Sequence, residues 1–222
     1  MDRIARDAAS IGALAEPVRR DLYDVVVGAA EPVSREQAAE ALGIPVHTAR
    51  FHLDRLVDDG LLEVEFRRLS GRTGPGAGRP TKLYRRTTRE VTVSLPERHY
   101  ELVGGILATG VERAARDGVA ADVAVRDAGE AEGRRAGAQA TGRPLLSVLA
   151  EHGYEPREGD GDVVLVNCPF DAMAREHTEL VCEINEAYVS GIVEGLGCAD
   201  EVDAVLDPGE GRCCVRVRRS AG

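Results

Sequence analysis

Apolar residues recur at helical spacing through the first quarter of the chain and predict four helices there. Ser34 and Gln37 stand at the spacing of a capping box, in which each caps the other at the start of a helix. Gly43 and Gly60 each follow a helical pattern, where a left-handed residue ends a helix. The four helices are expected at residues 2–14, 16–27, 35–42 and 46–57.

The fourth of these helices separates an apolar face from a polar one. Ala49, Leu53 and Leu56 fall on one side, which we expect to be buried. The polar side carries the residues that we expect to reach base edges or phosphates: His47, Thr48, Arg50 and Arg55. Two short helices joined by a Gly-containing turn are typical of a helix-turn-helix, whose second helix enters the major groove of DNA. An ordinary helical hairpin is the alternative for this segment alone.

Strict alternation replaces the helical period after Gly60. It predicts strands at 61–69 and 82–86, and the segment 71–80 between them is too rich in Gly and Pro for helix or strand. The result is a β-hairpin placed as the wing of a winged helix-turn-helix. Its cations are expected to contact phosphates or the minor groove: Arg72, Arg79 and Lys82. A phosphate-binding P-loop is excluded, because no Gly-Lys-Ser/Thr follows the glycines and the next element is a strand.

The rest of the chain predicts linking helices and a small mixed unit. A helix over 96–116 should direct Leu102, Ile106 and Val111 inward, and a second over 120–140 is rich in the small residues that permit close helix packing. The later elements are a helix at 145–152, a strand at 162–168, a helix at 177–197 and strands at 201–206 and 213–217. The fold class is therefore α+β, with three parts. They are a winged helix-turn-helix domain at 1–90, linking or dimerisation helices at 91–142 and a cysteine-bearing sensor domain at 143–222.

Charge is distributed unevenly along the chain. The formal net charge is −10, yet residues 1–90 carry 15 basic and 14 acidic groups and the remainder carry 13 and 24. Eight of the basic residues lie between Arg67 and Arg89, with no acidic residue among them. A basic stripe behind a helix pair favours binding to phosphate. A solvated run of charge is the alternative.

The cysteines and the absence of apolar segments bear on location and chemistry. No run of about 18 apolar residues exists, and the first residues lack the apolar stretch of a signal peptide, so we expect a cytoplasmic protein without a membrane part. In a reducing compartment, metal binding or redox chemistry is favoured over disulfides. All five cysteines fall in the last expected domain: Cys168, Cys182, Cys198, Cys213 and Cys214.

The expected positions of these cysteines allow several of them to meet. Cys168 ends a strand, Cys182 lies in the first turns of a long helix, and Cys213 and Cys214 open the last strand. Neighbouring strand residues face opposite sides, so one of Cys213 and Cys214 should face a site and the other the core. Three or four thiolates at one point suit zinc or an iron–sulphur cluster. Buried structural thiols are the alternative.

Three stretches resemble the recognition helix and wing of ArsR-type bacterial repressors. They are Arg50-Phe51-His52-Leu53-Asp54-Arg55-Leu56, Asp59-Gly60-Leu61-Leu62 and Gly78-Arg79-Pro80-Thr81-Lys82-Leu83-Tyr84. The resemblance covers about the first 90 residues. It implies a homodimer that binds double-stranded DNA at an inverted-repeat operator, with two recognition helices about one DNA turn apart.

Three later stretches resemble the carboxy-terminal domain of SufR-like regulators, which repress iron–sulphur-assembly operons and carry a cluster on three cysteines. They are Asn167-Cys168-Pro169-Phe170, Ala174-Arg175-Glu176-His177 with Leu180-Val181-Cys182, and Gly211-Arg212-Cys213-Cys214-Val215. The resemblance implies Cys168, Cys182 and Cys213 as ligands, with Cys214 competing for the third place. It departs at Asp171, where many relatives have His. The fourth ligand stays open between Cys198, His177 and Asp171.

These patterns lead to one expected function and two alternatives. The first is a dimeric repressor whose cysteines bind an iron–sulphur cluster as a redox or iron sensor. The second is a winged-helix regulator that senses zinc or a small organic ligand through the same domain, as related domains do. The third is a thiol enzyme. It is disfavoured because His177 stands five residues before Cys182, off its helical face, so we expect no enzymatic activity.

Overall fold

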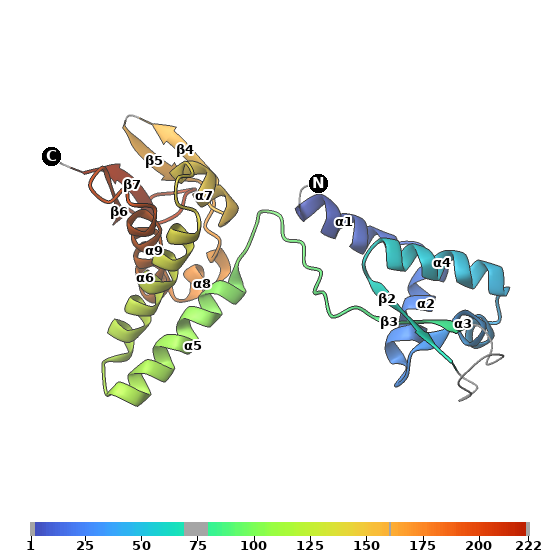
Figure 1. Ribbon diagram of the computed structural model, residues 1–222. Helices are drawn as coiled ribbons and strands as arrows, with labels where there is room; N and C mark the ends of the chain where they lie inside the picture. The colour runs from blue at the N-terminus through green and yellow to red at the C-terminus, as the bar shows by residue number, and fades with distance from the viewer. Residues whose placement is uncertain (1–2, 69–79, 160, 221–222) are drawn as a thin grey trace. The chain divides into compact units, whose positions relative to one another are not determined.

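The computed structural model describes residues 3–68, 80–159 and 161–220. The chain divides into two compact units, Met1–Val93 and Ser94–Gly222 (Figure 1). The helices expected as a separate linking segment at 91–142 pack within the second unit. No helix in the described part of the chain is long and apolar enough to cross a membrane.

The first unit combines four helices with a three-stranded antiparallel sheet, among the residues described. Its elements are α1 (Arg3–Ala13), α2 (Pro17–Gly28), β1 (Val33–Ser34), α3 (Arg35–Leu42), α4 (Val46–Asp58), β2 (Leu62–Arg67) and β3 (Thr81–Arg86). The strand order is β1-β3-β2. Leu22, Leu53, Leu56 and Tyr84 are fully buried in the core between the helices and the sheet. The tip expected between β2 and β3, with Arg72 and Arg79, lies outside the described residues.

Local signals fix the helix boundaries of this unit. The Ser34 hydroxyl accepts from the Gln37 N–H at 3.2 Å, and the Gln37 side chain accepts from the Ser34 N–H at 2.9 Å. The capping box is therefore confirmed. Gly43 ends α3 at φ 64° and Gly60 follows α4 at φ 73°, a backbone region that glycine enters without a steric penalty.

The second unit pairs helices with a four-stranded antiparallel sheet. Its described elements are α5 (Tyr100–Asp117), α6 (Ala121–Gln139), α7 (Leu145–Glu151), β4 (Pro156–Gly159), β5 (Asp162–Leu165), α8 (Asp171–Glu176), α9 (Thr178–Leu196), β6 (Val202–Leu206) and β7 (Val215–Arg219). The strand order is β4-β5-β7-β6. The long helix α9 packs against β6 and β7 and runs beside α6, which in turn packs against α5 (Figure 1).

Glycines let α6 and α9 approach each other at backbone distance. A Cβ at Gly133 would lie 2.0 Å from the Tyr188 carbonyl oxygen, and one at Gly191 would lie 2.1 Å from the Glu130 carbonyl oxygen. Gly137 and Gly195 continue the same seam one turn further along each helix. The small residues that predicted close helix packing thus place α9 directly against α6.

Two expectations about α5 are wrong. The helix begins at Tyr100 rather than at residue 96, because the residues before it bond elsewhere: the Glu97 carbonyl accepts from the Asn167 side chain, and the His99 N–H donates to the Pro169 carbonyl. Val111, expected inward, is 57% exposed, and Gly110 occupies the buried position beside it.

The strands beside the cysteines also differ from expectation. The strand expected over 162–168 ends at Leu165, since β5 pairs with β7 only through Val163 and Val164. The last strand covers Val215–Arg219, so Cys213 and Cys214 precede it. The sequence patterns did not anticipate β4 or α8, which are 4 and 6 residues long. Cys168, Cys213 and Cys214 therefore lie on loops that flank the sheet, whereas Cys182 lies on α9.

Candidate nucleic-acid interface and cysteine site

The amino-terminal end of α4 presents polar side chains on the surface of the first unit. His47 and Arg50 are exposed and Thr48 is half-buried. Pro45 stands at the cap position, and no side chain bonds to the first N–H groups of the helix. That end carries the positive end of the helix dipole and suits a phosphate group.

Asp54 connects α4 to the β2–β3 hairpin. Its carboxylate accepts from the Lys82 ammonium at 2.5 Å and from the Tyr84 hydroxyl at 2.7 Å. Arg50 lies 3.6 Å from the same carboxylate. Burial acts to raise the pKa of Asp54, but the bonds from Lys82 and Tyr84 hold that pKa below its ordinary value. Arg50 and Lys82, two of the cations expected to bind DNA, thus both contact the half-buried carboxylate of Asp54.

Other cations of the basic run also have acidic partners, which come from elsewhere in the chain. These pairs are Arg67 with Glu31 and Glu65, Arg85 with Glu63, Arg89 with Asp7 and, on α4, Arg55 with Asp59. The stretch that lacks acidic residues in sequence is therefore interleaved with carboxylates in space. DNA phosphates would compete with these carboxylates for the same guanidinium groups.

Four cysteine thiols of the second unit form a row of side-chain hydrogen bonds. Cys168 contacts Cys213, Cys213 contacts Cys214, and Cys214 contacts Cys182. The row joins the loop after β5, the start of α9 and the segment before β7. Both Cys213 and Cys214 take part, because neither lies in the strand whose alternation would send them to opposite faces.

The thiols differ in acidity along this row. A hydrogen bond with Cys213, together with burial, raises the pKa of Cys168. Bonding from Cys168 lowers the pKa of Cys213, but bonding with Cys214 and burial outweigh it and raise that pKa to about 11. The bond with Cys182 raises the pKa of Cys214 to about 12. Cys182 accepts at the end of the row, and its pKa is lowered by the bond from Cys214.

A buried amide faces two of the sulphurs. Asn185, one turn after Cys182 on α9 and fully buried, directs its Nδ2 to the Cys213 Sγ at 3.1 Å and the Cys168 Sγ at 4.0 Å. The Tyr154 hydroxyl donates to the Asn185 Oδ1 at 2.5 Å, which leaves the amide nitrogen for the sulphurs. Our sequence reasoning missed this pair. A polar residue within the apolar face Val181, Ile184, Tyr188 and Ile192 was the available signal.

The three residues considered for a fourth ligand lie in different surroundings. Cys198 follows the far end of α9, whose last residue Leu196 lies about 21 Å along the helix axis from Cys182, and its thiol donates to the Val193 carbonyl at 3.4 Å. His177 is exposed at the junction of α8 and α9. Asp171 lies close enough to Cys168 to help raise the pKa of that thiol, and its carboxylate pairs with Arg98 and Arg175.

The four thiols supply the right donors for a soft metal but form a row. Among residues 3–68, 80–159 and 161–220, no three His, Cys, Asp or Glu side chains are already grouped to hold a metal ion. Their chemistry nevertheless fits zinc or an iron–sulphur cluster, and an amide N–H aimed at sulphur is the kind of outer contact that supports a coordinating thiolate.

Residues 14–65 match a family model described as a helix-turn-helix domain, a domain found in ArsR-type regulators. The match spans α2, α3 and α4. No curated protein and no solved structure matches the chain. The helix-turn-helix domain indicates a DNA-binding transcriptional regulator.

Proposed function

We propose that this protein is a transcriptional repressor that binds an inverted-repeat operator as a homodimer and senses iron–sulphur or redox state through its cysteines. The observation that carries the proposal is the pairing, in one chain, of a helix-turn-helix with a row of four cysteine thiols. The site itself supports the sensing half of the proposal, since a buried amide that donates to a sulphur is the kind of contact that supports a coordinating thiolate.

The DNA-binding surface would consist of α4 and the β2–β3 hairpin, acting as the wing. His47, Thr48 and Arg50 would face base edges from the major groove, because they lie at the exposed start of α4. Arg55 and Lys82 would bind phosphates, and Arg72 and Arg79 would extend this contact from the hairpin tip. The contacts of Arg55 and Lys82 would replace their carboxylate partners, and phosphate contacts release counterions from DNA, so affinity should fall with salt.

A second copy of the chain would pack on α5. The exposed side of this helix carries Val111 together with small residues at Gly104, Ala108 and Ala115. These positions follow helical spacing, and they form a face on which two helices can approach closely. Sedimentation of a Val111→Glu variant tests this part: the proposal predicts a monomer where the unchanged chain is a dimer.

At the cysteine site, Cys168, Cys182 and Cys213 would hold the cluster, with Cys214 the competitor of Cys213. When bound, an iron–sulphur cluster supplies a redox-active centre there. The thiols with raised pKa must lose their protons first, so loading should weaken as pH falls. Asn185 would donate to the resulting thiolates, and the fourth ligand would come from Asp171, His177 or Cys198.

The test is the iron, acid-labile sulphide and zinc content of protein purified without oxygen, together with its visible absorbance. The proposal predicts iron and sulphide in equal amounts, lost in Cys182→Ser and kept in Cys198→Ser, whose thiol stands away from the row. Zinc without sulphide would favour the zinc-sensing alternative. Protein free of metal and sulphide that binds its operator normally would overturn the sensor half of the proposal.

A further inference from the structure

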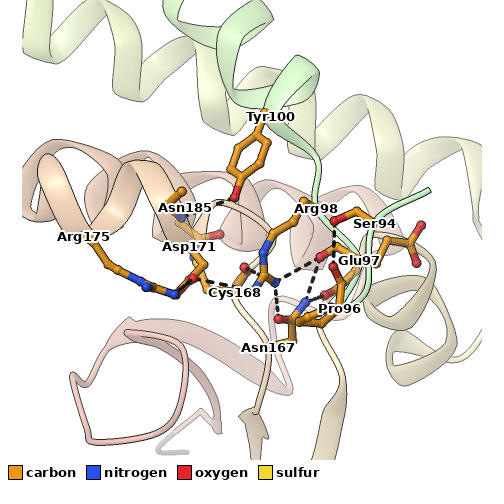
Figure 2. A network of polar contacts seen from close by, with 12 residues as sticks. Ser94, Pro96, Glu97, Arg98, Tyr100, Asn167, Cys168, Asp171, Arg175 and Asn185 are labelled. Atoms are coloured by element: carbon orange, nitrogen blue, oxygen red, sulfur yellow. Dashed lines mark hydrogen bonds and ion pairs between the residues drawn. The ribbon is translucent and has the colours of Figure 1, made fainter. Parts of the chain in front are cut away.

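The first residues of the second unit are bonded to the loop that carries Cys168. The first unit ends at Val93 and the second begins at Ser94, so the covalent path between them enters the second unit through Ser94–Tyr100. Figure 2 shows this segment against the loop Asn167–Asp171, with Arg98 between the two.

Arg98 contacts three acceptor groups of the loop. Its Nη1 donates to the Cys168 carbonyl at 3.1 Å and also to the Asn167 side-chain oxygen. Its Nη2 lies 3.6 Å from the Asp171 carboxylate. The Arg98 side chain is only 16% exposed, and its planar guanidinium presents donors to these acceptors from two nitrogens in a fixed fork, whereas an ammonium has all its donors on one nitrogen.

The loop bonds back to the segment through its own polar groups. The buried Asn167 amide donates to the Glu97 carbonyl at 3.0 Å and to the Gly153 carbonyl at 2.6 Å. The Pro169 carbonyl accepts from the His99 N–H at 3.0 Å. Hydrogen bonds thus join the Ser94–Tyr100 segment to the loop on both sides of Arg98. A movement of either part would therefore move the other.

Cys168 is bonded on two sides. Its carbonyl accepts from Arg98 (Figure 2). Its thiol contacts Cys213 and lies 4.0 Å from the Asn185 amide. A change at the thiol, whether metal ligation or oxidation, moves a residue whose backbone is bonded to the segment leading to the DNA-binding unit.

We infer that Arg98 is a positioning residue that fixes the Cys168 loop and couples the state of the cysteine row to the Ser94–Tyr100 segment. This rests on the proposed function, because it requires that the cysteine row be loaded or oxidised. The guanidinium acts through its hydrogen bonds, because those to Cys168 and Asn167 determine how far the segment moves when the loop moves.

Hydrogen exchange of the full chain tests the coupling directly. Amide exchange is measured with and without anaerobic reconstitution by ferrous iron and sulphide, in the unchanged protein and in Arg98→Ala, Arg98→Lys and Arg175→Ala. Arg175 is the matched control, because it pairs with the same Asp171 carboxylate but bonds neither Asn167 nor Cys168. Retained protection of α9 shows that a variant is folded.

In the unchanged protein and in Arg175→Ala, reconstitution should alter exchange both in the loop 165–172 and in the segment 94–100. In Arg98→Ala the exchange of the loop should still change on reconstitution, while the change in the segment falls to less than half of that in the unchanged protein. The change in the segment of Arg98→Lys should lie between these two values. A full response of the segment in both Arg98 variants would overturn the inference and leave the proposed function standing. No response of the loop in the unchanged protein would overturn both.

Discussion

Tyr154 and Asn185 show how a polar pair is kept in the core of the second unit. Both side chains are fully buried, and each serves the other as a hydrogen-bond partner beside the Cys213 sulphur. Tyr154→Phe would leave the Asn185 carbonyl oxygen without a donor, which costs about 1–3 kcal/mol of unfolding free energy. Urea unfolding followed by circular dichroism measures this loss. Tyr188→Phe is the control, since its partner His152 is only half-buried and can turn to water; an equal loss in both variants would contradict the account.

Asp54 gives the first unit a pH-dependent contribution. Its folded pKa lies below the ordinary value near 3.8, so its stabilisation is complete above that value and is lost as pH falls through the folded pKa. The unfolding free energy of the unchanged protein should therefore exceed that of Asp54→Asn at neutral pH, and the difference should shrink below about pH 4. Urea unfolding at several pH values gives the comparison. A difference in unfolding free energy that stays constant to well below about pH 4 would show that the bonds from Lys82 and Tyr84 do not depend on the negative charge of Asp54.

At this scale the sequence predicted candidate site residues but not how they pair. The cysteines and the polar surface of α4 were proposed from spacing and from resemblance. Asn185 contacts Tyr154 across 31 positions and Arg98 contacts Cys168 across 70, and no local pattern encodes such pairs. The carboxylate partners of the basic run, such as Asp7 and Glu31, could not be foreseen for the same reason, because they come from other elements.

The packing of α6 on α9 depends on glycine at the contact. In Gly133→Ala, the new Cβ would lie 2.0 Å from the Tyr188 carbonyl oxygen, so the helices must separate. Overpacking of this kind costs about 1–3 kcal/mol or more, and thermal unfolding should show it. Gly105→Ala on α5 is the matched control, because nothing lies within 4 Å of its Cβ and alanine should stabilise the helix by about 1 kcal/mol. A Gly133→Ala variant as stable as the Gly105→Ala variant would contradict the close packing.

Elements with strong local signals were predicted best. The helix over 35–42 has its cap, its stop and its apolar period within one short stretch, and its bounds are as expected. The start of α5 and the end of β5 were misplaced because tertiary bonds decide them: Asn167 and Pro169 capture the backbone groups of Glu97 and His99. The prediction that Val111 is buried was off by one position in the helical period, because the buried residue is its neighbour Gly110.

At the scale of the whole molecule, the two units have different charge and different chemistry. The cations near the helix-turn-helix belong to a part of the chain that is almost neutral, while the rest of the chain carries the excess of acid. This division suits a regulator in which only one unit is attracted to DNA and the other responds to a signal. The charge division could be read from the sequence, whereas the connection through Arg98 required the structure.

The central claim is that the state of the cysteine row sets the affinity for DNA. The most direct measurement is the affinity of the full chain for a duplex selected from random sequence, compared between protein reconstituted anaerobically with iron and sulphide and the same protein without them. The account predicts a selected inverted repeat and affinities that differ by about tenfold or more. Equal affinities in the two states, or the selection of no sequence at all, would contradict it.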